Sequence, residues 1–89
     1  MPTISMFHGL LVKMFFMDNE RHHAPHIHVE YQSDKATYDI PSGDRLAGAL
    51  PISKERLVLA WIELHRDELL ADWQLAVRGE ELFRIDPLK

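Results

Sequence analysis

The stretch HIHVEYQSDKATYDI, residues 26–40, decides the fold. Apolar and polar side chains alternate over its first six residues, which is the pattern of a strand with one buried face. The apolar positions are Ile27, Val29 and Tyr31, and the polar positions are His26, His28 and Glu30. The alternation resumes after Ser33-Asp34, a pair that favours a hairpin turn. The stretch therefore predicts two antiparallel strands that share one apolar face.

The segments on either side of this hairpin extend the sheet. Residues 4–17 are rich in Met, Phe, Leu and Val without a polar face at helical spacing, so they predict one buried strand, bent or bulged at Gly9. Residues 41–44, PSGD, predict a turn, and Leu46 to Leu50 predict a short further strand. We therefore expect an antiparallel sheet of about four strands, arranged as an N-terminal meander.

Helix signals occupy the C-terminal part of the chain. Ser53 is a good N-cap, Glu55 lies in the first turn, and apolar residues run from 57 to 77 before Gly79, a natural residue after a helix end. One helix of this length is long for so small a core, so we predict a break near Asp67. The sequence thus predicts an α+β fold, with the sheet packed against one long or two shorter helices, as a single domain over residues 1–89.

Composition narrows the function classes. With 89 residues and no cysteine, the chain can form no disulfide and no thiolate metal site. Its formal net charge of -4 disfavours non-specific binding to nucleic acid, so nucleic acid is expected only as a possible substrate. No apolar run approaches a membrane span, and the beginning, MPT, lacks the pattern of a secretory signal. We expect a cytoplasmic protein without membrane contact.

Histidine is the feature that points to chemistry, because five of the six histidines lie in the first third of the chain. Imidazole, with an ordinary pKa of about 6.5, can act as a ligand, a base or an acid at cellular pH. Two histidines two residues apart on a strand place both rings on one side, where they could chelate a divalent transition metal such as zinc once a third ligand converges. The candidate metal ligands are His22, His26 and His28, and His23, Glu30, Asp39 or His8 could supply the third ligand in place of His22.

Acid-base catalysis without a metal is the second interpretation of the same cluster. One imidazole could deprotonate a nucleophile while another protonates a leaving group, as in ribonuclease-type phosphoryl transfer. The candidate catalytic residues are His26, His28 and His65. His65 lies one helical turn after Trp61, and the alternative interpretation of this histidine is a structural role in the core. Exposed histidines without a function, or a sensor of pH or metal, are further alternatives, and whether the protein is an enzyme stays open.

Several motifs resemble a known family over nearly the whole chain. They are Phe7-His8-Gly9, the stretch His22-x-x-Pro25-His26-Ile27-His28-Val29, Gly48-x-Leu50-Pro51, and the helical segment 61–70 followed by Trp73 and Gly79. Together they resemble the small bacterial family called domain of unknown function 4160. Ala24 departs from the pattern, because many relatives have a second proline there.

The resemblance implies a genomic setting rather than a reaction. Genes of this family often lie beside a gene for another small domain, in a pairing that looks like a toxin-antitoxin module. The chain would then be the toxin-like half, neutralised by a cognate antitoxin-like protein. A non-enzymatic protein-binding or regulatory module is the alternative function, and a homodimer is the alternative partner.

Overall fold

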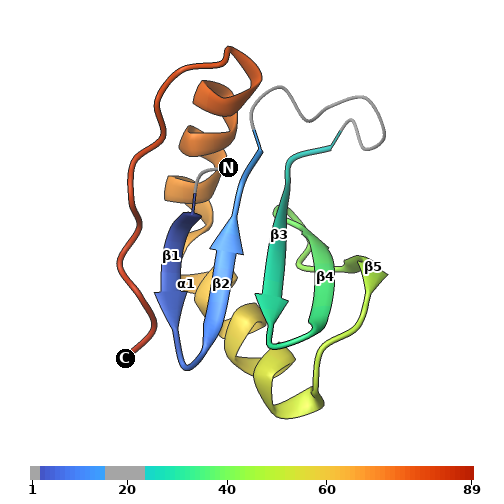
Figure 1. Cartoon of the computed structure of the whole chain (residues 1–89). Coiled ribbons are helices and arrows are strands. Elements are labelled where there is room, and N and C mark those ends of the chain that lie inside the picture. Colours follow the sequence, from blue (N-terminus) through green and yellow to red (C-terminus); the bar gives the residue numbers. More distant parts are fainter. Residues whose placement is uncertain (1–2, 16–23) are drawn as a thin grey trace.

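Strands that are neighbours in the sequence pair with one another in the computed structural model, which describes residues 3–15 and 24–89 (Figure 1). The elements are β1 (Thr3–Phe7), β2 (Leu10–Lys13), β3 (His26–Tyr31), β4 (Asp34–Asp39), β5 (Arg45–Gly48) and α1 (Ile52–Val77). All pairs are antiparallel, in the order β1-β2-β3-β4-β5, and α1 lies across one face of the sheet. The predicted α+β fold is confirmed, with five strands instead of about four.

The additional strand comes from the segment that we predicted as one bent strand. Its described part forms a hairpin, because the chain reverses at His8 and Gly9 and pairs Phe7 with Leu10. Both turn residues have positive φ, 50° and 81°, and two such residues in succession make the tight turn whose twist matches that of paired strands. The single-strand prediction was wrong because it treated Gly9 as a bulge.

The hairpin of β3 and β4 follows the predicted alternation. Ile27 and Val29 on β3 and Tyr38 on β4 are fully buried, as expected for the apolar face. The turn itself is one residue earlier than predicted, at Gln32 and Ser33, because Tyr31 pairs with Asp34. This small shift leaves the predicted faces unchanged.

The core lies between the sheet and α1. Trp61, Ile62 and Leu69 of the helix are completely buried against the apolar face of the strands. The helix is interrupted at His65, whose φ of -119° and ψ of 22° are not helical, two residues before the predicted break at Asp67. No helix in the described part of the chain combines the length and the apolar character that crossing a membrane requires.

The sequence predicted the C-terminal end of α1 correctly but not the residue that caps its N-terminal end. Pro51 precedes the helix and no side chain caps it, so the prediction of Ser53 as N-cap was wrong. The C-terminal end is as expected: Gly79 has a φ of 73°, and the Glu80 amide donates to the Leu75 carbonyl at 2.9 Å. Beyond this end the chain turns back along the molecule.

The returning C-terminal segment docks beside β1 (Figure 1). The Ile85 amide donates to the Ile4 carbonyl at 2.8 Å, and Ile85 is buried. The indole Nε1–H of Trp61 donates to the Asp86 carbonyl at 2.8 Å. The segment therefore covers the β1 edge of the sheet without forming a strand.

A buried hydroxyl links β4 to the beginning of α1. The Tyr38 hydroxyl donates to Glu55 Oε2 at 2.7 Å, and the Arg45 guanidinium donates to the same oxygen at 3.2 Å. Burial, followed by the bond to Glu55, raises the pKa of Tyr38 well above its ordinary value, so the phenol stays protonated. This cluster sets the position of the helix start against β4 and β5.

Replacing Gly48 by alanine should loosen β5. Gly48 has a φ of 73°, and a Cβ there would overlap the backbone carbonyl of Lys35 on β4. We expect Gly48→Ala to lower the free energy of unfolding by about 2 kcal/mol or more, through strain and overlap together. Urea titration measures this loss, with Ala47→Ser on the same exposed strand as the control. Equal midpoints for the two variants would contradict the role given to Gly48.

Asp72 should make stability depend on pH. Burial raises the pKa of its carboxyl above the ordinary 3.8, opposed by the hydrogen bond that its Oδ1 accepts from the Phe83 amide, and Oδ2 has no hydrogen-bond partner among the described residues. Because the folded state favours the protonated form, this contribution to stability is present below the ordinary pKa and is lost as pH rises through the raised value.

Asp72→Asn keeps an acceptor for the Phe83 amide but cannot ionise. Its melting temperature, relative to that of the wild type, should therefore be higher at about pH 7 than at about pH 4. Thermal unfolding followed by circular dichroism at both pH values measures the difference. A relative melting temperature that stays constant or falls with rising pH would count against a raised pKa.

Candidate functional site

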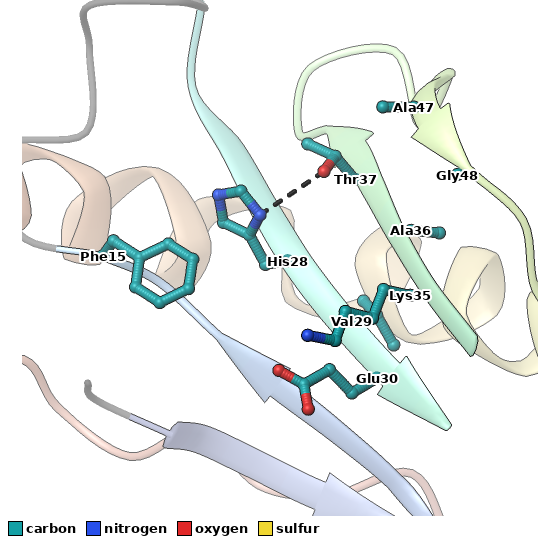
Figure 2. Close-up of a pocket in the computed structure, with 9 residues that line it drawn as sticks. All are labelled: Phe15, His28, Val29, Glu30, Lys35, Ala36, Thr37, Ala47 and Gly48. Atoms are coloured by element: carbon teal, nitrogen blue, oxygen red, sulfur yellow. Dashed lines mark hydrogen bonds between the residues drawn. The ribbon is translucent and has the colours of Figure 1, made fainter. Parts of the chain in front are cut away.

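A pocket of about 390 Å³ opens on the sheet face that α1 does not cover (Figure 2). Its lining combines an aromatic ring, titratable groups, a hydroxyl and small residues. The residues that carry this chemistry are Phe15, His28, Glu30, Lys35 and Thr37, and the small ones at the β5 end are Ala47 and Gly48. In volume it lies toward the lower end of the range for small-molecule sites, roughly 300–1,000 Å³.

Strand register explains why these side chains share one face. Lys13, His28, Thr37 and Ala47 are directly opposite one another across β2, β3, β4 and β5. Residues opposite each other in antiparallel strands project to the same side of a sheet. This row therefore belongs to the open face, while the neighbouring row through Val29 faces the helix. The prediction that His28 and Glu30 share the polar face agrees with this register.

An ion pair neutralises a carboxylate of the pocket lining, that of Glu30. The Lys13 ammonium lies 2.9 Å from Glu30 Oε2. The hydrogen bond from Lys13, followed by the positive charges around it, lowers the pKa of Glu30, so this carboxylate is ionised at neutral pH. Lys35, directly opposite Glu30 on β4, is exposed at the rim and adds a further positive charge. The pocket thus has a local positive balance in a chain of negative net charge.

His28 is the titratable ring in this pocket. It is half-buried on β3, with Nδ1 3.4 Å from the Thr37 hydroxyl. Its ring centroid lies 4.4 Å from that of Phe15 and 5.1 Å from that of His26. Figure 2 shows His28 between Phe15 on one side and Thr37 on the other. The ring is therefore positioned by neighbours while it lines an open cavity.

His26 departs from the prediction that its side chain belongs to the polar face and not to the core. Its side chain is only 1% exposed and packs against Trp73 of α1, with ring centroids 4.9 Å apart. The pairing of β2 with β3 ends at His28, so His26 lies beyond it, where the ring can reach the helix. Since a carbonyl can only accept, Nδ1–H of His26 donates to the Ala24 carbonyl at 2.9 Å. His26 is adjacent to His28 but belongs to the core.

The remaining predicted histidines lie elsewhere. His65 is at the break in α1, where its ring packs on Trp61 and its Nδ1–H donates to Glu68 at 2.7 Å. It does not line the pocket on the sheet. His22, the third predicted metal ligand, falls outside the described residues. The structure thus brings His26 and His28 together and leaves His65 apart.

Metal ligation by the described residues lacks a complete ligand set. No three His, Asp or Glu side chains in residues 3–15 and 24–89 converge as a metal site. Because Nδ1 of His26 is committed to a carbonyl, a ligand role for this ring has to use Nε2, which is the usual arrangement of a metal-bound histidine. The set His22, His26 and His28 therefore stays a prediction.

Sequence reasoning missed three side chains in or beside the pocket. Lys13 neutralises Glu30, Lys35 places a cation at the rim, and Phe15 contributes the aromatic wall. A hairpin at His8-Gly9, had it been recognised, would have placed Lys13 beside His28. No local pattern marks Phe15, whose position depends on how the chain leaves β2.

A family model matches most of the chain. The family described as "Domain of unknown function (DUF4160)" matches residues 9–74, from the β1–β2 turn to the last part of α1. The matched range includes the whole lining of the pocket. No match is found among curated proteins or among solved structures.

The two adjacent histidines should respond differently to truncation. His26→Ala removes a buried ring from Trp73 and a hydrogen bond from Ala24, so we expect it to lower the free energy of unfolding by about 2–3 kcal/mol. His28→Ala, at a half-buried position that lines a cavity, should cost about 1 kcal/mol or less. Urea unfolding of both variants tests this, and similar losses would show that His28 is equally structural.

Proposed function

Because the chain belongs to the family described as "Domain of unknown function (DUF4160)", whose description states no activity, we propose a function from the pocket on the open sheet face. The protein is the toxin-like component of a two-protein module, and it cleaves RNA by histidine acid-base catalysis centred on His28. One observation carries this proposal: a half-buried imidazole lines a cavity together with a lysine and a hydroxyl.

The chemistry needs a proton acceptor beside a phosphodiester. His28 takes the proton of the ribose 2′-hydroxyl, the 2′-oxygen bonds to phosphorus, and the bond from phosphorus to the 5′-oxygen breaks. Solvent protonates the leaving oxygen, the product carries a cyclic phosphate, and His28 returns its proton to solvent. Lys35 at the rim offers a positive charge to the phosphate oxygens.

The negative net charge of -4 is compatible with this substrate. Specificity for RNA requires contacts at the site rather than a basic surface, and a weakly attracting surface lowers non-specific binding. The Lys13 ammonium offsets the charge of Glu30, and Lys35, which also lies near Glu30, leaves one positive charge in excess around the pocket. The charged side chains around the pocket thus favour binding of a phosphate group there.

Binding without catalysis is the second candidate function, and β5 favours it. All four residues of this edge strand, from Arg45 to Gly48, are exposed. An exposed edge can accept a strand from another chain, which suits an antitoxin-like protein or a second copy. Under this alternative the histidines need no chemical role.

Expression of variants in bacteria separates the two functions. We expect His28→Ala to abolish growth inhibition and RNA cleavage, and Lys35→Ala to reduce cleavage about tenfold or more, because a charge contact to the phosphate is lost. His65→Ala, a histidine outside the pocket, is the matched control and should keep both activities. Circular dichroism confirms that each variant is folded. Growth inhibition by folded His28→Ala at the wild-type level would refute catalysis at His28.

A chelator in the same cleavage assay tests the metal alternative. Acid-base catalysis by His28 predicts that cleavage is unchanged after treatment with chelator, because no step uses a metal. Loss of cleavage that zinc restores would instead support a metal-dependent site built from His22, His26 and His28.

A further inference from the structure

Small side chains line the β5 end of the pocket. Ala47 and Gly48 line its β5 end, and Gly48 cannot accept a Cβ because the Lys35 carbonyl occupies that space. This end of the pocket is therefore a hollow lined on β5 by no side chain larger than a methyl group. A larger side chain at Ala47, which is exposed on the same strand, would fill the hollow without removing any charged or titratable group.

An aromatic ring forms the opposite side of the pocket. Phe15 is half-buried, and its ring is inclined by 56° to that of His28 at a centroid distance of 4.4 Å. In Figure 2 the ring lies to one side of His28, away from Thr37 and β5. A ring held at a wall of this kind offers a flat apolar surface, on which nucleobases of any sequence can stack.

The chemistry of the lining changes from one side of His28 to the other. The Phe15 side is apolar, while β4 contributes the Thr37 hydroxyl and the Lys35 ammonium, which lies near the Glu30 carboxylate that Lys13 pairs. A ligand that suits both sides has a flat ring at one end and an anion at the other. The volume of about 390 Å³ suits one such ligand unit rather than a larger folded molecule.

We propose that the pocket takes a single unpaired nucleotide of an RNA strand, with its base against Phe15 and its phosphate between His28 and Lys35. This inference rests on the proposed function and names the substrate form, which is single-stranded RNA. In a duplex the bases are stacked and paired, so none is available to Phe15, whereas a base in a single strand can turn out of the stack. Because the pocket opens on an uncovered sheet face, the rest of the RNA strand can continue beyond it.

Binding of a fluorescent RNA of about ten nucleotides tests the proposal. Its 2′-oxygens are methylated, so it cannot be cleaved and the wild-type chain can be used. We expect Phe15→Leu, which keeps an apolar side chain but loses the ring, to weaken binding about tenfold, and Phe15→Tyr to retain it. Ala47→Leu should weaken binding to a similar extent by filling the hollow.

Matched controls make the outcomes decisive. Ala49→Leu adds the same bulk at an exposed position that does not line the pocket, and it should bind as the wild type does. A duplex of the same sequence should bind about tenfold more weakly or worse. Unchanged affinity in Phe15→Leu and Ala47→Leu, equal affinity for the duplex, or no binding by the wild type would each overturn the inference.

The result is separable from that of the proposed function. If His28→Ala loses RNA cleavage while Phe15→Leu binds as the wild type does, catalysis at His28 stands and the stacking of a base on Phe15 falls. If Phe15→Leu loses binding while His28→Ala still cleaves, the nucleotide site stands and the role of His28 falls.

Discussion

Burial of one sheet face under α1 is the constraint on which the other features depend. Val29 and Tyr38 must point into the core, so the residues that alternate with them along β3 and β4 must point away. A slip of one residue in any pairing would bury charged groups and expose the core. The register that protects the core is therefore also what aligns Lys13, His28 and Thr37 on the opposite face.

Local pattern was sufficient for the part of the fold in which each strand has one clear apolar side. The alternation from His26 to Ile40 predicted β3, β4 and the burial of Ile27, Val29 and Tyr38, and the run of apolar residues before Gly79 predicted the helix and its end. Residues 4–17 lack such alternation, because apolar residues occupy most of the positions on both faces of this segment. There the fold depended on the backbone conformation of His8, which a non-glycine residue seldom adopts.

The candidate site was predictable only where it follows from one strand. Placing His28 and Glu30 together needed no more than the period of a strand. The burial of His26 depends on where β2 ends and on Trp73, which lies 47 positions along the chain, and neither is visible in the sequence around His26. The ammonium of Lys13 and the ring of Phe15 likewise enter through pairing between segments distant in sequence.

The C-terminal segment has a consequence for how copies of the chain could associate. By donating from Ile85 to Ile4 it occupies the edge at β1, while β5 stays exposed at the other edge. A sheet with one blocked edge can join another sheet at one side only. Edge-to-edge growth would thus end with two molecules joined through β5, and this asymmetry protects the protein against open-ended polymerisation.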